Sequence, residues 1–276
     1  MEKLQAALEK ARGERQGQPA RHTQKTRVQQ PSSSEPDSIQ ERWAALPVFA
    51  PNENHLIHNR IMTYSISAQA MPFDMLRTKI LLMMRQNNWT RLAITSPEPN
   101  CGKTTLACNM AFGFSRQQDL RTMLLDFDMR KPSVAAVLGH GADAAIDTVL
   151  SGESLPQEHM CCVNENLAIS MVRTSVVDPM KTVMSPQTPE VLDQLQEDFQ
   201  PDLMIFDLAP MLAVDETRAI LKYVDCAIIV ARAEQTRMGR LDMCEREVSE
   251  YTNVLGMVLN NCRYSDTHDS YGEEGY

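Results

Sequence analysis

The sequence predicts an α/β fold in which helices cover both faces of a doubly wound, mainly parallel sheet. Several short apolar runs have the length of buried strands, and helix-length segments separate them. Strands that are apolar on both sides and alternate with helices are typical of parallel sheets. The strand candidates are 91–96, 122–126, 203–207, 226–230 and 255–259, and the helix candidates between them include 73–86, 103–117, 189–199 and 238–252.

Composition narrows the class of protein. The 276 residues are 43% hydrophobic, which is enough for a sizeable core, and 27 Lys+Arg against 36 Asp+Glu argue against a nucleic-acid partner. No apolar run approaches the roughly 20 residues of a membrane helix, and the first residues lack the apolar stretch of a signal peptide. The cysteines include no C-x-x-C pair, which favours reduced thiols. We therefore expect a cytoplasmic protein with no membrane span of its own.

The chain is expected to divide into three parts. Residues 1–50 should be mostly disordered, because 16–40 are rich in Gln, Ser, Pro and Arg. One short amphipathic helix is expected there, from the helical spacing of Leu4, Ala7, Leu8 and Ala11. This helix is either a solvated, frayed element or a docking peptide. Residues 51–263 hold the predicted sheet and helices, and 264–276 form an acidic tail that should be flexible.

The best-defined motif lies between the strand 91–96 and the helix 103–117. A turn at this place presents backbone N–H groups to an anion. Gly102 allows close approach of the backbone, Lys103 can reach phosphate oxygens, and Thr104 offers a hydroxyl to Mg²⁺. The other loop residues expected to contact a nucleotide are Asn100, Cys101 and Thr105. Pro97 replaces the usual first glycine of the motif, so an ordinary helix start is the alternative.

Carboxylates follow two further strands. Asp126 ends the strand 122–126 and Asp128 follows it by two residues, and Asp207 ends the strand 203–207. Beside a phosphate loop, such residues could hold Mg²⁺ or accept a proton from an attacking hydroxyl. The alternative is a set of turn or helix-capping aspartates. The neighbouring phosphate loop favours the catalytic interpretation.

Three segments, TSPEPNCGKTT, LLDFDMRKP and LMIFDLAP, occur in an order and spacing that resemble a known family. They are similar to the Walker A, A′ and B motifs of bacterial tyrosine kinases, which are P-loop proteins related to MinD and ParA. The likeness is to the CpsD/CapB-type cytoplasmic kinases of capsule and exopolysaccharide synthesis. The segments FDMLRT, IDTVLSGE and MVLNN are also similar to family segments. The resemblance covers about residues 60–276.

The resemblance implies an ATP-dependent protein-tyrosine autokinase that uses Mg²⁺ and regulates polysaccharide polymerisation and export. Lys103 would clamp the phosphates, and Thr104 would bind Mg²⁺. Asp126 and Asp128 would be the A′ carboxylates, one of which activates the acceptor tyrosine while Asp126 also contacts the metal. Asp207 would be the Walker B residue on the metal.

The same resemblance implies roles at the end of the chain. Asn260 would lie near the adenine, with the adjacent Asn261 leaving the register open by one residue. The autophosphorylation sites would be Tyr264, Tyr271 and Tyr276.

Partners are implied as well. Family members that lack membrane segments use a separate membrane adaptor, similar to a chain-length regulator of polysaccharide export, which would recruit this chain to the inner face of the plasma membrane. The family's ring-forming E-x-x-R-x-x-R pattern maps to Met71, Asp74 and Arg77, so only its last residue is kept. Assembly into a homo-oligomer is therefore left open.

Two alternatives remain beside the kinase. A MinD/ParA-like positioning ATPase usually has a lysine near the start of the loop, where this chain has Pro97. A catalytically weak, ATP-binding scaffold of the export machinery is suggested by the altered ring pattern. The retention of the loop lysine and threonine and of the three strand-end aspartates opposes it.

Overall fold

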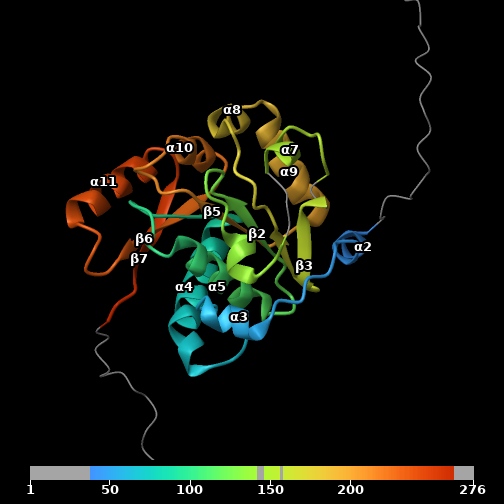
Figure 1. Cartoon of the computed structure of the whole chain (residues 1–276), viewed down its shortest axis with the longest axis horizontal. Coiled ribbons are helices and arrows are strands. Elements are labelled where there is room, and N and C mark those ends of the chain that lie inside the picture. The colour runs from blue at the N-terminus through green and yellow to red at the C-terminus, as the bar shows by residue number, and fades with distance from the viewer. Residues whose placement is uncertain (1–37, 142–145, 156–157, 264–276) are drawn as a thin grey trace, which may run out of the picture. The chain divides into compact units, whose positions relative to one another are not determined.

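A seven-stranded sheet in the order β3-β4-β2-β5-β1-β6-β7 forms the centre of the structure (Figure 1). The computed structural model describes residues 38–141, 146–155 and 158–263. The strands are β1 (Arg91–Thr95), β2 (Thr122–Phe127), β3 (Met160–Asn164), β4 (Leu167–Ser170), β5 (Leu203–Leu208), β6 (Cys226–Arg232) and β7 (Asn253–Asn260). All neighbouring strands are parallel except the pair β3 and β4, so the mainly parallel, doubly wound prediction is confirmed.

The antiparallel hairpin of β3 and β4 was not predicted. Its strands are 5 and 4 residues long, too short for a clear periodic pattern. The side chain of Asn166 holds the turn between them, because its Nδ2 donates to the carbonyl oxygens of Ser115, Gln117 and Leu120 at distances of 3.1, 2.6 and 3.0 Å. A tertiary contact of this kind leaves no local signal in the sequence.

Helices cover both faces of the sheet. They are α2 (Ile39–Ala44), α3 (Glu53–His58), α4 (Met71–Asn87), α5 (Lys103–Ser115), α6 (Val134–Leu138), α7 (Ile146–Leu150), α8 (Pro179–Val183), α9 (Gln187–Phe199), α10 (Glu216–Leu221) and α11 (Met238–Ser249), with a 3-10 turn η2 (Ala68–Ala70) before α4. One apolar cluster joins the sheet to α3, α4, α5 and α6, and a second joins it to α2, α7, α8, α9, α10 and α11. Alternate residues of β2 enter the two clusters, as a strand buried on both faces requires.

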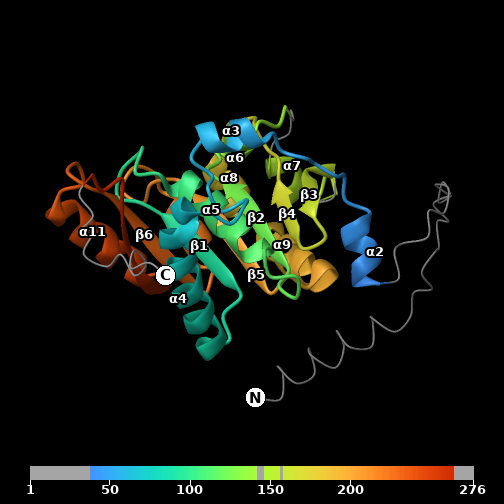
Figure 2. The same ribbon diagram turned by 90° about the horizontal axis from the view of Figure 1, so that it is seen from below.

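The folded unit begins earlier than the predicted boundary at residue 51. Helix α2 has a capping box formed by Ser38 and Glu41, and it lies at the opposite end of the sheet from α11 (Figure 2). Trp43 is buried against α9, with its Nε1 donating to the Phe199 carbonyl oxygen at 2.8 Å. Val48 forms a parallel bridge with Cys162 of β3. One tryptophan in a polar stretch anchors the segment, and average composition does not reveal such an anchor.

Two of the expected segments cannot be compared with the structure. The amphipathic helix near the start and most of the linker after it lie outside the described residues, as does the tail 264–276 with its three tyrosines. Within the described ranges, no helix is long and apolar enough to cross a membrane.

The sheet brings the predicted chemistry to one edge. Strand β5 lies between β1 and β2, and Asp207 of β5 is the register partner of both Ile94 on β1 and Asp126 on β2. The phosphate loop follows β1 directly and leads into α5. Ligands of open α/β sheets bind at the carboxyl ends of the strands, and the loop and the aspartates meet there.

Candidate functional site

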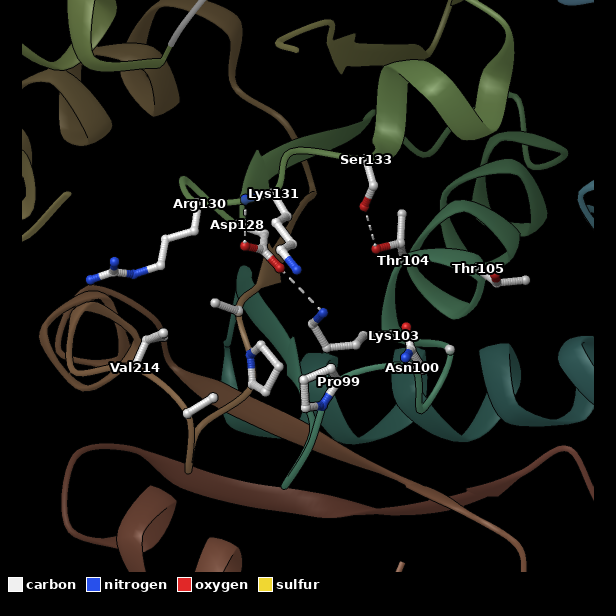
Figure 3. A pocket seen from close by; sticks show the side chains of 14 residues that line it. Pro99, Asn100, Lys103, Thr104, Thr105, Asp128, Arg130, Lys131, Ser133 and Val214 are labelled. Carbon is white, nitrogen blue, oxygen red and sulfur yellow. Dashed lines mark hydrogen bonds and ion pairs between the residues drawn. The ribbon is translucent and has the colours of Figure 1, made fainter. Parts of the chain in front are cut away.

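A hollow of about 650 Å³, here called the phosphate hollow, opens at this edge of the sheet (Figure 3). Of the residues predicted from the sequence, those that line it are Asn100, Gly102, Lys103, Thr104, Thr105 and Asp128. Cys101 belongs to the same loop but does not line the hollow, because its side chain is buried with its Sγ 3.7 Å from the Thr236 hydroxyl. The structure therefore gathers the predicted loop around one opening.

The loop has the left-handed backbone that close approach to an anion requires. Gly102 precedes α5 with a φ of 90°, and Asn100 has a φ of 62°. A Cβ atom on residue 102 would lie 2.1 Å from Nδ2 of Asn260. Glycine alone adopts this φ readily and leaves room for the Asn260 side chain. This geometry explains why the motif has a glycine at position 102.

Lys103 and Asp128 form a buried ion pair inside the phosphate hollow. Nζ of Lys103 lies 3.3 Å from Oδ2 of Asp128, and the two side chains are 10% and 9% exposed. Lys103 begins α5, and Asp128 follows the end of β2. The lysine is thus held at the mouth of the loop, where phosphate oxygens of a nucleotide would compete with Asp128 for its charge.

Thr104 connects the loop to the strand-end carboxylates. Its hydroxyl donates to Oδ2 of Asp207 at 2.5 Å and lies 3.0 Å from Oγ of Ser133. Ser133 was not among the residues predicted from the sequence. It occupies the N-cap position of α6, but its hydroxyl makes no capping bond and contacts Thr104 instead. The sequence signal for Ser133 was its position just after the A′ segment, at the start of a helix. A serine at such a position is usually interpreted as a helix cap, so this signal did not point to the site.

Asp207 is a buried carboxyl group with incomplete hydrogen bonding among the described residues. Burial raises its pKa to about 6, although the charge of Lys103 and the hydrogen bond from Thr104 act in the opposite direction. Its Oδ1 is buried and has no hydrogen-bond partner among the described residues. Carboxylate and hydroxyl oxygens are the ligands Mg²⁺ prefers, so the unpartnered Oδ1 and the Thr104 hydroxyl fit a magnesium ion.

Asp126 has a different set of contacts. Its Oδ2 accepts hydrogen bonds from the backbone N–H groups of Ser133 at 2.7 Å and Val134 at 2.9 Å, and its Oδ1 accepts one from the N–H of Asp128 at 3.2 Å. Burial, and then the charge of Asp207, raise its pKa well above the usual value. These contacts are those of a turn-capping aspartate, so Asp126 fixes the segment that carries Asp128 and Ser133.

Two side chains, one on β6 and one on β7, hold the phosphate loop. Asn260 and Arg232 are register partners on β7 and β6. Asn260 donates through Nδ2 to the Cys101 carbonyl oxygen at 2.9 Å, and Arg232 donates through Nη1 to the Asn100 carbonyl oxygen at 3.3 Å. Asn261 is exposed with a φ of 60°. The structure therefore brings Asn260, rather than its neighbour, to the loop.

The positions that match the family's ring pattern make contacts within the chain. Met71 is 60% exposed, and Asp74 pairs with Arg116, the C-cap residue of α5. Arg77 donates to the Gly113 carbonyl oxygen at 2.7 Å and lies 3.9 Å from Asp74. The charged groups on this face of α4 therefore bind α4 to the end of α5.

The chain is similar in sequence to a family of nucleotide-binding domains and to named kinases. Residues 92–274 match the family model described as the CobQ/CobB/MinD/ParA nucleotide binding domain. The tyrosine-protein kinase YwqD of Bacillus subtilis is 25% identical over 216 residues, which cover 78% of this chain and 90% of that protein. The tyrosine-protein kinase ptk of Acinetobacter johnsonii is 25% identical over 192 residues, 69% of this chain, and the match spans only 26% of that protein.

A solved structure shares the fold. The crystal structure of the chimerical protein CapA2B2 superposes with a TM-score of 0.66 at 21% identity, covering 80% of this chain and 96% of that chain. The resemblance seen in the three motifs is thus confirmed by similarity to named bacterial tyrosine kinases over 69% and 78% of this chain. The chain belongs to the CobQ/CobB/MinD/ParA nucleotide-binding domain family, and its relatives within that family include bacterial tyrosine kinases.

Proposed function

We propose that this chain is an ATP-dependent protein-tyrosine kinase that phosphorylates its own C-terminal tyrosines and so regulates exopolysaccharide or capsule polymerisation and export. One observation carries the proposal. Lys103, its partner Asp128 and the Thr104 hydroxyl line one hollow, and that hydroxyl is bonded to the buried carboxylate of Asp207, a pair that fits Mg²⁺. These are the groups that phosphoryl transfer requires.

Each group has a separate task. Lys103, at the start of α5, neutralises phosphate charge, and the backbone N–H groups of 100–105 surround the phosphates. Thr104 and Asp207 would hold Mg²⁺, which when bound supplies positive charge to the phosphates. Asp126 orders the turn that presents Asp128. Asn260 holds the loop from β7, on the side where the base would lie.

The transfer step balances with groups in this hollow. The tyrosine hydroxyl oxygen forms a bond to the γ-phosphorus, and the bond from that phosphorus to the oxygen bridging to the β-phosphate breaks. The electron pair of the broken bond leaves on ADP. Asp128 is the carboxylate that lines the hollow, and among the described residues its second oxygen accepts only the backbone N–H of Lys131, at 3.1 Å. We assign it the hydroxyl proton, once the phosphates have drawn Lys103 away.

The resemblance of the three motifs to the kinase family also suggests a partner. We infer that a separate membrane adaptor, of the kind that regulates chain length in polysaccharide export, recruits the chain from the cytoplasm to the inner face of the plasma membrane. A homo-oligomer would need contacts other than the charges on α4, because Asp74 and Arg77 are engaged within the chain.

The deciding experiment compares the wild type with Lys103→Met in native cells by phosphopeptide mass spectrometry of residues 264–276. Phosphotyrosine at Tyr264, Tyr271 or Tyr276 that disappears in the variant is the expected result. Lys79→Met, which removes an exposed lysine of α4, is the matched control and should leave the phosphorylation unchanged. Stoichiometric ATP binding with an unmodified tail, during active polymer synthesis, would instead favour a scaffold or a positioning ATPase.

A further inference from the structure

Ser133 brings a third segment of the chain to the side of the phosphate hollow where Thr104 meets Asp207. It lines the hollow just before α6 and faces Thr104, which lies in the first turn of α5 (Figure 3). Its Oγ lies 3.0 Å from Oγ1 of Thr104, and Thr104 in turn contacts Asp207 of β5. Three segments that are far apart in the sequence therefore place their side-chain oxygen atoms in one row.

The direction of the hydrogen bond between Ser133 and Thr104 follows from a count of protons. A threonine hydroxyl has one hydrogen and two lone pairs. Thr104 donates its hydrogen to Oδ2 of Asp207 at 2.5 Å, so it accepts the hydrogen bond from Ser133. The order of donation is thus from Ser133 to Thr104 and from Thr104 to Asp207.

This order leaves two free acceptors in the row. One is the second lone pair of Thr104, and the other is Oδ1 of Asp207, which has no hydrogen-bond partner among the described residues. A hydroxyl that is bonded at its hydrogen and at one lone pair cannot rotate without breaking a hydrogen bond. Its remaining lone pair therefore keeps one direction. Hydrogen bonds of this kind orient the ligands of protein-bound metals and strengthen metal binding.

The backbone of Ser133 is itself held in place. Oδ2 of Asp126 accepts the backbone N–H of Ser133 at 2.7 Å and that of Val134 at 2.9 Å. Asp126 lies on β2, where its register partner is Asp207 on β5. The sheet therefore fixes the serine relative to Asp207, as a group that positions another side chain requires.

Helix capping does not account for the Ser133 hydroxyl. Ser133 is the N-cap residue of α6, yet its side chain makes no capping bond, and its backbone (φ −135°, ψ −11°) lies outside the extended region usual for capping residues. Ser38, before α2, makes a complete capping box with Glu41. The two serines therefore differ in what their hydroxyl groups do, and that of Ser133 serves the hollow.

We propose that Ser133 is a positioning residue for Mg²⁺: its hydroxyl turns the free lone pair of Thr104 toward the ion. The affinity for the metal then depends on a side chain that does not touch the metal. The proposal rests on the proposed function, because the metal accompanies the nucleotide of that site. The turn that holds Ser133 also carries Asp128, so one segment positions both the metal ligand and the carboxylate to which we assign the tyrosine proton.

The test measures nucleotide binding with and without metal, using the full chain at pH 8. Calorimetry gives the dissociation constant for ADP in EDTA and in saturating Mg²⁺. Ser133→Ala should weaken the binding of Mg-ADP about tenfold, the size expected when an orienting partner of a metal ligand is lost. The binding of ADP in EDTA should stay unchanged, because the serine acts through the metal ligand.

Two further substitutions at the same position separate the hydrogen bond from the shape of the side chain. Ser133→Cys has nearly the same shape but is a weak donor, so it should behave like Ser133→Ala. Ser133→Thr keeps the hydroxyl and should restore most of the affinity for Mg-ADP. Ser38→Ala is the matched control: loss of its cap should lower the urea midpoint of unfolding and leave both dissociation constants unchanged.

Three results would overturn the proposal. They are unchanged binding of Mg-ADP in Ser133→Ala and Ser133→Cys, equal weakening of ADP with and without Mg²⁺, and a Ser133→Thr variant as weak as Ser133→Ala. None of these measurements depends on phosphorylation. A Mg²⁺-specific loss in a chain that never forms phosphotyrosine would support the positioning role and contradict the kinase. Phosphotyrosine in a chain whose Mg-ADP binding ignores the Ser133 variants would support the kinase and contradict the positioning role.

Discussion

Asp126 and Asp207 are register partners on the neighbouring strands β2 and β5, so two buried carboxyl groups lie side by side at the edge of the sheet. The charge of Asp207 adds to burial in raising the pKa of Asp126. Lys103, which offsets part of this charge at Asp207, is itself paired with Asp128. The site thus holds more acids than cations, and a divalent cation is the complement it lacks.

This excess of acids predicts a pH-dependent stability that the variant Asp207→Asn should remove. An acid whose pKa is raised by folding stabilises the protein below the pKa of the unfolded chain, and that contribution is lost as the pH rises through the folded value of about 6. We therefore consider the free energy of unfolding of the variant minus that of the wild type, measured in EDTA. This difference should increase by about 2 kcal/mol between pH 4.5 and pH 8. Urea unfolding at both pH values measures this double difference, and a constant difference would contradict the raised pKa.

The Lys103–Asp128 pair predicts a loss of stability that a second substitution repairs. Lys103→Met leaves a buried carboxylate without its cation, which should lower the free energy of unfolding by about 3 kcal/mol in the absence of nucleotide. In K103M/D128N no charge is left unpaired, and the loss should fall to about 1 kcal/mol or less. Denaturant unfolding of both variants is the measurement. Equal losses in the two would show that the pair contributes little.

Gly102 and Asn260 predict a non-additive pair of substitutions. Gly102→Ala places a Cβ against Nδ2 of Asn260 and forces alanine into a left-handed backbone, the latter costing about 1–2 kcal/mol by itself. Asn260→Ala removes the hydrogen bond to Cys101, worth about 1 kcal/mol. The double variant should be more stable than the sum of the single losses predicts, because the clash has gone. Additive losses would mean that Asn260 moves aside freely.

Trp43 predicts that residues before 51 contribute to the stability of the folded unit. Trp43→Ala should lower the free energy of unfolding by about 3–5 kcal/mol, as for other large buried aromatic residues. Trp43→Phe keeps a ring against Phe199 but loses the hydrogen bond to its carbonyl oxygen, and it should cost less. Thermal and urea unfolding compare the two. A negligible effect of Trp43→Ala would restore the boundary expected from composition.

The fully buried strands were predictable because burial on both faces gives a run of mostly apolar residues, which is a local signal. The structure has β2 at Thr122–Phe127 and β5 at Leu203–Leu208, each within a residue or two of the predicted run. Helices α5 and α9 also lie where apolar spacing placed them. The short helices α6, α7, α8 and α10 have 5 or 6 residues each, too few for a periodic pattern.

The candidate site was predictable where a motif fixes the chemistry, and unpredictable where distant side chains meet. Lys103, Thr104 and Asp207 lie together as the motifs required. Asp126 makes the contacts of a turn, the alternative that the sequence had also offered, and its expected role on the metal stays a prediction. The pair that Arg130 of the phosphate hollow forms with Glu216 joins residues 86 positions apart, so no local sequence pattern predicts it.

The strand order has a consequence for how the chain folds. Strand β1, which carries the phosphate loop, pairs only with β5 and β6, where Arg91 meets Met204 and Leu92 meets Cys226. These partners come far later in the chain, so loop closure must precede any pairing of β1, and such topologies fold slowly. The phosphate loop therefore has no sheet to hold it until these later strands have been added. Nucleotide should bind only after the central strands have assembled, and it should slow global unfolding rather than speed folding.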